Sequence, residues 1–225
     1  MAKIKSTSTR TRLSPEQRQL EIVQAARQVF ESQGYEASTI ADIAKCVGVV
    51  EGTVLHYFKT KRALMTKVIE EFYSDITGAM EDGVAGINGI RNKIRYVIHT
   101  HMSVLHDNAN LCTVILNESR SSQNELLEKV HELNRRYSNI IISIVREGKE
   151  SGEIADFASP ILVRNVVFGG IEHYLWDIVS GGRRPDIDKI ADQLTQLVYS
   201  GIMNRQDDVS GEVNQLIVKL NNMIK

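Results

Sequence analysis

The sequence predicts an all-α protein, with an N-terminal domain of three short helices followed by a larger helical domain. Apolar residues recur at intervals of three and four along most of the chain, and no segment alternates as a half-buried strand would. Capping residues, glycines and prolines separate these periodic segments. The length of 225 residues suits one small domain joined to a larger one.

The first helix is predicted to begin at Ser14, before Pro15 and Gln17. A serine N-cap, a proline at the first helical position and a glutamine that completes a capping box are a typical helix start. Apolar residues then follow the helical period as far as Phe30, and Gly34 supplies a C-cap. Residues 1–13 are polar, basic and aperiodic, so we expect a disordered basic arm.

Two short helices follow, joined by a glycine turn. Ser38 or Thr39 caps the first of them, and Gly48 ends it after about three turns. The second is predicted from residue 51 to residue 58, and the basic run Lys-Thr-Lys at 59–61 follows it. This order of elements is typical of a helix-turn-helix DNA reader.

In such a motif the second helix presents its N-terminal residues to base edges in the major groove. Val54 and Phe58 are expected to face the core. Thr53 could bond a phosphate or a base edge, Gly52 would let the backbone approach closely, and Glu51 could accept from a cytosine amine. The candidate DNA contacts are Ser38, Thr39, Glu51, Gly52, Thr53, Leu55, His56, Tyr57, Lys59 and Lys61.

Charge is distributed unevenly along a chain whose net charge is close to zero. Residues 1–67 hold 11 lysines and arginines against 6 acidic residues, whereas the remainder holds 16 against 22. A basic segment attracts DNA through counterion release, and an acidic body is better suited to small molecules or to self-association. A solvated charged face is the simpler alternative for either half.

The motifs from residue 39 to residue 61 resemble the signature of TetR-family transcriptional regulators. The resemblance rests on Thr-Ile-Ala-Asp-Ile-Ala at 39–44, Gly-Val at 48–49, Gly-Thr at 52–53 and Tyr-Phe-Lys-Thr-Lys at 57–61. It implies a helix-turn-helix domain over residues 14–61 and a domain for effector binding and dimerisation over residues 62–204.

Two residues depart from the family pattern. Val50 stands where a serine or a similar cap is common, and Leu55 stands where a base-contacting tyrosine is frequent. Leu55 could touch a thymine methyl group, so an unusual operator preference is expected. The alternative is that these helices form a corner of a helical bundle that has no affinity for DNA.

The larger domain is predicted to be helical throughout. A long helix should run from Arg62 to about Met80, and Gly78, Gly83, Gly86 and Gly89 should make the next connection loose. Further helical segments are expected at 90–105, 111–118, 126–148, 160–179 and 187–203. Residues 205–225 repeat apolar residues as a short amphipathic helix, which we expect to dock on its own domain.

The segments 160–179 and 187–203 are the most apolar pair of predicted helices. The family resemblance implies that such a pair from each subunit forms a four-helix dimer interface, which would place two recognition helices one DNA turn apart. Burial of both helices within a monomer is the alternative. The candidate interface residues are Ile178, Ile190, Leu194, Leu197, Val198 and Ile202.

Apolar runs with a few polar residues suit an effector pocket in this domain. The runs 110–123, 148–154 and 168–172 also resemble acyl-CoA-responsive regulators of fatty-acid degradation, and Glu118 and Arg120 match that subgroup's Glu-x-Arg positions. An acyl-CoA would need cations for its phosphates, and another apolar effector remains the alternative. The candidate pocket residues are Asn117, Glu118, Arg120, Tyr137, Asn165, His173 and Tyr174, and the available arginines are Arg120, Arg135, Arg136, Arg164, Arg183 and Arg184.

Enzymatic and metal-binding functions find no support. His99 and His101 are two residues apart and so point to different sides of a helix, Cys46 and Cys112 form no CxxC pair, and no phosphate-binding or nucleophile motif follows a strand. We therefore expect no metal and no cofactor. No segment is apolar enough for a membrane span or a secretory signal, which favours a cytoplasmic protein.

The sequence thus favours a homodimeric repressor that binds a palindromic operator in double-stranded DNA. A small apolar effector, with acyl-CoA as one candidate, would release it. The alternative is a helical small-molecule-binding or catalytic protein whose N-terminal helices are only structural.

Overall fold

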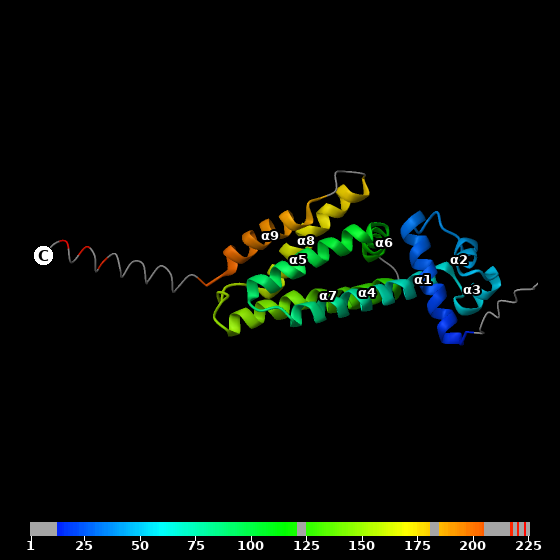
Figure 1. The fold of residues 1–225 in the computed structure, drawn as a ribbon, viewed down its shortest axis with the longest axis horizontal. Helices are drawn as coiled ribbons and strands as arrows, with labels where there is room; N and C mark the ends of the chain where they lie inside the picture. Colours follow the sequence, from blue (N-terminus) through cyan, green and yellow to red (C-terminus); the bar gives the residue numbers. More distant parts are fainter. Residues whose placement is uncertain are drawn as a thin grey trace, which may run out of the picture. The chain divides into compact units, whose positions relative to one another are not determined.

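The computed structural model describes residues 13–120, 125–180 and 185–204, together with Ile217, Leu220 and Met223; at 118–120 and 125–126 it describes the backbone only. Over these residues it contains nine α-helices and a single isolated β-bridge (Figure 1). The predicted all-α fold class is confirmed. The amphipathic helix predicted at 205–225 lies almost entirely outside the described residues.

The chain divides into two compact units between Glu70 and Glu71. Helix α4 (Lys61–Ala85) begins in the first unit and continues into the second. The sequence placed the domain boundary at residue 61, but Leu64 and Met65 in the first turn of α4 are fully buried. These side chains belong to the first unit, which explains the later boundary.

The first unit contains α1 (Pro15–Gln33), α2 (Ile40–Val47) and α3 (Glu51–Tyr57). Ser14 and Gln17 form the predicted capping box of α1. Gly48 ends α2 in the left-handed conformation, with φ of +73°. Because a side chain at this φ is strained, a glycine suits the tight turn into α3.

Side chains from α1, α2, α3 and the residue directly after α3 form the core of the first unit. Ile22 and Ala26 from α1, Ile43 from α2 and Val54 from α3 have no exposed surface. Phe58, directly after α3, is 6% exposed. The predicted inward orientation of Val54 and Phe58 is therefore confirmed.

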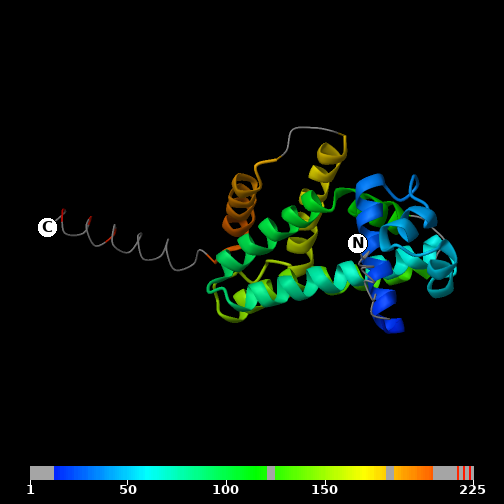
Figure 2. The ribbon, with the colours of Figure 1, turned by 45° about the vertical axis from the view of Figure 1, so that its right-hand side comes forward.

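The second unit contains the C-terminal part of α4 and helices α5 (Ile90–Asp107), α6 (Ala109–Arg120), α7 (Glu125–Glu150), α8 (Pro160–Val179) and α9 (Ile187–Ile202). Helix α5 is central, since α6, α7, α8 and α9 all pack against it (Figures 1 and 2). Its buried stripe follows the helical period, with Ile94, Val97, Ile98, His101, Met102 and Leu105. One histidine therefore lies within an otherwise apolar stripe.

The predicted end of α4 was wrong by more than one turn. Gly78 and Gly83 were expected in a loose connection, but both lie inside α4, which runs to Ala85. A side chain at Gly83 would overlap the Tyr96 ring of α5. Gly83 thus makes room for a neighbouring helix and does not break its own.

The α7–α8 loop is tied to the end of α9. Ile154 and Met203 form the antiparallel bridge, and the Ala155 N–H donates to the Ile202 carbonyl at 2.8 Å. The Tyr199 hydroxyl donates to the Glu153 carboxylate at 2.7 Å. Among the described helices, none combines the length and apolar character that a bilayer span requires.

Candidate DNA-binding helix and effector cavity

Helix α3 has one buried side and one open side. Val54 is buried, whereas Glu51, Gly52, Leu55 and His56 are exposed. A side chain at Gly52 would meet no atom within 4 Å. The predicted recognition residues therefore lie together on a face that is open within its unit.

The departures from the family pattern make this face unusually apolar. Val50 is the N-cap residue of α3, makes no side-chain cap and is 73% exposed, and Leu55 is 39% exposed. If this helix enters the major groove as the sequence predicts, exposed aliphatic side chains on it would suit contact with thymine methyl groups. Both residues are available for such contact.

Thr39 has a structural role at the start of α2. Its hydroxyl accepts from the Asp42 N–H and donates to the Asp42 carboxylate at 2.6 Å. The hydrogen bond from the Thr39 hydroxyl is the main reason that the pKa of Asp42 is lowered. This capping box fixes the first turn of the helix that precedes the glycine turn.

Two predicted DNA contacts have partners of their own within the protein. Ser38 is 3% exposed and its hydroxyl donates to the Tyr35 carbonyl, so its side chain is not open to a phosphate. The Lys61 ammonium donates to the Ser38 carbonyl at 2.7 Å and lies over the Tyr35 ring. Lys59 is exposed, so it is the better candidate of the two lysines for a contact with a phosphate.

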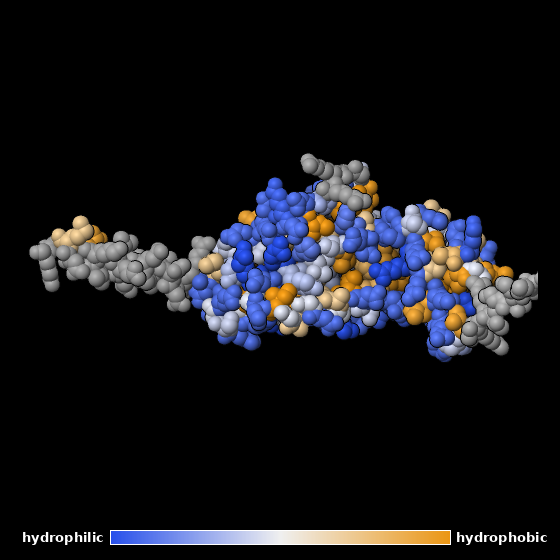
Figure 3. Space-filling view, in the orientation of Figure 1, coloured by the Kyte–Doolittle hydropathy of each residue, from blue (hydrophilic) through white to orange (hydrophobic). Residues whose placement is uncertain are grey.

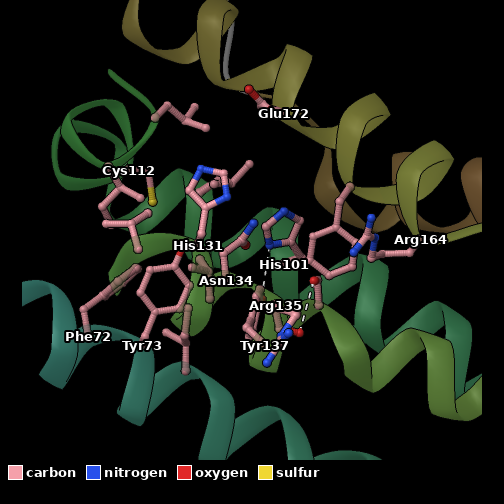
Figure 4. Close-up of a pocket in the computed structure, with 18 of the residues that line it drawn as sticks. Phe72, Tyr73, His101, Cys112, His131, Asn134, Arg135, Tyr137, Arg164 and Glu172 are labelled. Carbon is pink, nitrogen blue, oxygen red and sulfur yellow. Dashed lines mark hydrogen bonds between the residues drawn. The ribbon is translucent and has the colours of Figure 1, made fainter. Parts of the chain in front are cut away.

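A cavity of about 880 Å³ lies in the second unit and is lined by residues of α4, α5, α6, α7 and α8 (Figure 4). Its lining residues include apolar and aromatic side chains, with Phe72, Tyr73, Ile76, Cys112, Ile115 and Leu116. They also include polar and charged side chains, with Glu128, His131, Arg135, Arg164, Asn165 and Glu172. In Figure 4, Phe72, Tyr73 and Cys112 lie on one side of the cavity and Arg164 lies on the other, which suits an amphipathic molecule.

In Figure 4, His101 and Tyr137 lie between Phe72, Tyr73 and Cys112 on one side and Arg164 on the other. The His101 Nδ1 and the Tyr137 hydroxyl are 3.1 Å apart, and the His101 ring packs against Phe168 at 4.4 Å between centroids. Burial lowers the pKa of His101 to about 4, so the imidazole is neutral at physiological pH. Burial likewise raises the pKa of the Tyr137 phenol.

The predicted pocket residues are only partly brought together. Tyr137 and Asn165 line the cavity, whereas Asn117, His173 and Tyr174 are not among its lining residues. The side chains of Glu118 and Arg120 lie outside the described residues. Sequence reasoning missed His101 and the α4 residues, although His101 lies in the apolar stripe of α5 and so carried a signal of burial.

Helix α8 is apolar on two sides. Val163, Val167, Ile171 and Leu175 are buried within the unit. A second set of large apolar side chains is exposed, and part of it is visible over α8 in Figure 3. This exposed set comprises Ile161, Leu162, Val166, Trp176 and Val179 of α8 and Leu197 of α9.

The predicted interface residues differ in how open they are. Leu197 is 74% exposed, whereas Val198 is buried within its own chain and contributes to the packing of α9. Ile178, Ile190, Leu194 and Ile202 are partly buried. Of the predicted set, only Leu197 is fully open.

Surface ion pairs connect α9 to α5. The Arg95 Nε donates to the Asp192 carboxylate at 2.5 Å, and Asp188 lies 3.4 Å from the same guanidinium. The hydrogen bond from Arg95 is the main reason that the pKa of Asp192 is lowered. Over the described residues, no group of three or more histidine, cysteine or acidic side chains is arranged to hold a metal ion.

Comparison with protein families identifies both parts of the chain. The model for bacterial regulatory proteins of the tetR family matches residues 22–68, and a TetR C-terminal model, described as YsiA-like protein, C-terminal region, matches residues 66–201. The chain is a TetR-family transcriptional regulator. It is therefore a DNA-binding protein and not an enzyme, and the alternative of a catalytic helical protein is not favoured.

Relatives of this TetR-family regulator include a fatty acid metabolism regulator and a transcriptional repressor. It is 32% identical over 186 residues to the fatty acid metabolism regulator protein of Bacillus subtilis, covering 83% of this chain and 96% of that protein. The repressor KstR2 of Rhodococcus jostii is 23% identical over 189 residues, covering 82% and 91%. The crystal structure of the regulator FadR from Bacillus subtilis in complex with stearoyl-CoA superposes with a TM-score of 0.70 at 32% identity, covering 81% of this chain and 98% of that chain.

Proposed function

We propose that this regulator is a homodimeric repressor that binds a palindromic operator through α3 and is released by a long-chain acyl-CoA. The observation that carries the proposal is the cavity formed by α4, α5, α6, α7 and α8, which is lined by apolar and by charged side chains in a chain similar to a regulator crystallised with stearoyl-CoA. The cavity volume lies within the range of about 300–1,000 Å³ that is usual for small-molecule sites.

The exposed face of α3 supports the operator contact. Thr53 is half-buried near the start of the helix, and Lys59 is exposed directly after it. In a helix-turn-helix, residues at the start of the second helix read base edges, and basic residues beside it hold phosphates. Thr53 is accordingly assigned to the groove and Lys59 to the backbone of the operator.

The mixed lining of the cavity supports an acyl-CoA over a purely apolar effector. Phe72, Ile76 and Leu116 provide apolar surface for a hydrocarbon chain. Arg135 and Arg164 also line the cavity and could pair with phosphates. Glu128 and Glu172 are lining residues as well and would repel a phosphate placed next to them, so the phosphates should lie at the arginines.

The second apolar side of α8 supports dimerisation. A helix that is apolar on all sides is normally covered on all sides. Leu162, Val166 and Trp176 are nevertheless 60%, 49% and 53% exposed within one chain. Gly170 lies on this helix with open space around it, which would allow a partner helix to approach closely. A second copy that covers this face would bring two α3 helices to one operator.

An electrophoretic mobility shift with the DNA upstream of the regulator's own gene tests the proposal. The protein should shift this fragment and should release it when palmitoyl-CoA is added. Neither CoA nor palmitate should release it at the same concentration. Release by palmitate alone, or no effect of palmitoyl-CoA on a stable complex, would reject the effector class.

Two variants separate the roles assigned to α3. Lys59→Ala should weaken binding to all duplexes and reduce the slope of log affinity against log salt by about 1. Thr53→Ala should weaken the operator more than unrelated DNA. Unchanged binding in both variants would place the DNA contact elsewhere.

Light scattering after size exclusion tests the dimer. The wild-type protein should have twice the chain mass of 25.3 kDa at micromolar concentration. Leu162→Glu should yield a monomer, because it would place a charge in the proposed apolar interface. A monomeric wild-type protein that still binds a palindrome would contradict this part of the proposal.

A further inference from the structure

The central part of the cavity contains a neutral hydrogen-bonding pair formed by His101 of α5 and Tyr137 of α7. His101 is 9% exposed and Tyr137 is 2% exposed, yet both line the cavity. Their mutual hydrogen bond, at 3.1 Å, is the only one that the described part of the structure gives to either side chain. The surrounding partners are rings: Phe168 packs on both residues, and Tyr73 packs on Tyr137.

The pair has more hydrogen-bonding capacity than its own contact uses. A neutral imidazole has one N–H, and a phenol has one O–H. If Tyr137 donates to Nδ1, the N–H at Nε2 remains to donate. If Nδ1 donates to Tyr137, the phenol O–H remains. In either tautomer, one donor is left for a third group.

A donor left without a partner in an apolar environment destabilises the folded state, because its hydration is lost. The described part of the structure gives no hydrogen bond to the second ring nitrogen of His101, and that nitrogen is not among its fully buried unpaired atoms. The residue also lines the cavity. The remaining donor is therefore best satisfied by a molecule inside the cavity.

The position of the pair indicates which part of such a molecule it meets. In Figure 4, His101 and Tyr137 lie between Phe72, Tyr73 and Cys112 on one side and Arg164 on the other. The apolar side suits a hydrocarbon chain, and the arginine side suits a polar head. The pair thus lies where the chain of an amphipathic effector joins its head.

We propose that His101 and Tyr137 form a subsite that donates a hydrogen bond to the thioester carbonyl oxygen of the effector. This rests on the proposed acyl-CoA effector and adds the residues that select a thioester. A carbonyl oxygen takes up the free donor without bringing charge into the cavity. A free carboxylate would place a negative charge beside an imidazole that burial keeps neutral, which is less favourable.

A pair of ligands that differ only in this oxygen tests the proposal. Palmitoyl-CoA has the thioester carbonyl, and S-hexadecyl-CoA has a CH2 group in its place. Calorimetric titration of the full-length protein should give about five- to tenfold tighter binding of palmitoyl-CoA, the effect of one neutral hydrogen bond. Equal affinity for the two ligands would overturn the subsite while leaving the acyl-CoA proposal intact. Binding of neither would overturn both.

Variants then assign the preference to the pair. The double variant His101→Phe/Tyr137→Phe keeps an aromatic ring at both positions but removes the hydrogen-bonding atoms of both side chains, so its two affinities should agree within about twofold. The single variants identify the donor, because only the loss of the donating group should abolish the preference. Tyr73→Phe removes another hydroxyl from the same cavity and should leave the ratio of the two affinities unchanged.

A double variant that still prefers palmitoyl-CoA would overturn the subsite, as would a Tyr73→Phe protein that loses the preference. Circular dichroism and operator binding without ligand establish that each variant is folded. If the double variant does not fold, the two single variants decide: preference retained in both would overturn the assignment.

Discussion

Replacement of Gly148 by alanine should destabilise the second unit, although alanine is the better helix former. Gly148 is buried near the end of α7. An added Cβ would overlap the Ile154 side chain and lie 3.2 Å from the Ile90 side chain. Ile154 cannot easily move away, because its N–H donates to the Gly148 carbonyl at 2.9 Å and it forms the bridge with Met203.

The expected magnitude follows from two opposing terms. An extra methyl group in a close-packed site destabilises by about 1–3 kcal/mol. The change from glycine to alanine in a helix contributes up to about 1 kcal/mol in the other direction. The net loss in the free energy of unfolding should be about 1–2 kcal/mol. In a protein of this size that loss lowers Tm by about 2–8 °C.

Gly78→Ala in α4 is the control for a glycine that lies inside a helix without a close neighbour. Its Cβ would meet no atom within 4 Å. This variant should therefore be neutral or more stable by up to about 1 kcal/mol. Both variants are compared with the wild type by urea unfolding and calorimetry at one protein concentration, because the proposed dimerisation would make Tm depend on concentration. A Gly148→Ala protein as stable as Gly78→Ala would refute the packing argument.

Three further predictions concern a buried histidine, an exposed leucine and a surface arginine. Burial lowers the pKa of His101 to about 4, so between pH 6.5 and pH 4 the unfolded chain binds a proton that the folded chain does not, and the free energy of unfolding falls as pH falls. Urea unfolding at pH 7 and pH 5 should show that the wild type loses about 2 kcal/mol more than His101→Phe over this range. Equal losses in the two proteins would contradict the lowered pKa of His101. If Leu55 reads a thymine methyl group, one dT→dU substitution in the operator should weaken the wild type about fourfold and leave Leu55→Ala unaffected, as measured by fluorescence anisotropy. Arg95→Met should lower the free energy of unfolding, measured by urea titration, by less than about 1 kcal/mol, because its partners Asp188 and Asp192 are exposed. A larger decrease in the free energy of unfolding would show that these ion pairs hold α9 in place.

Elements that depend on neighbours within one helical turn could be predicted from the sequence. The Ser14 cap, the Thr39 cap and the Gly48 turn each involve groups at most four residues apart. The end of α4 depends instead on a distant residue. Glycine is a residue type that often ends a helix, but at Gly83 the ring of Tyr96 on another helix occupies the space that a side chain would need. The sequence-based prediction considered only the flexibility of the glycine, because nothing in the local sequence shows that Tyr96 lies beside it.

The cavity pair illustrates the same division between local and distant information. His101 follows the apolar period of α5, so its burial could have been predicted from the stripe in which it lies. A buried histidine needs a hydrogen-bonding partner. That partner, Tyr137, lies 36 residues away on α7, and no local pattern relates the two. Tyr137 was selected as a pocket residue, but its contact with His101 was not.

Helix α8 marks where periodicity stops being informative. A contrast between apolar and polar faces predicts which side of a helix is buried, but α8 is apolar on nearly every side and offers no such contrast. In the structure one side of α8 faces its own domain: Val167 and Ile171 are buried, and Phe168 lines the cavity. The other side, with Leu162 and Trp176, is left open within the chain. The same helix therefore supplies a wall of the cavity and the face on which the proposed dimer depends.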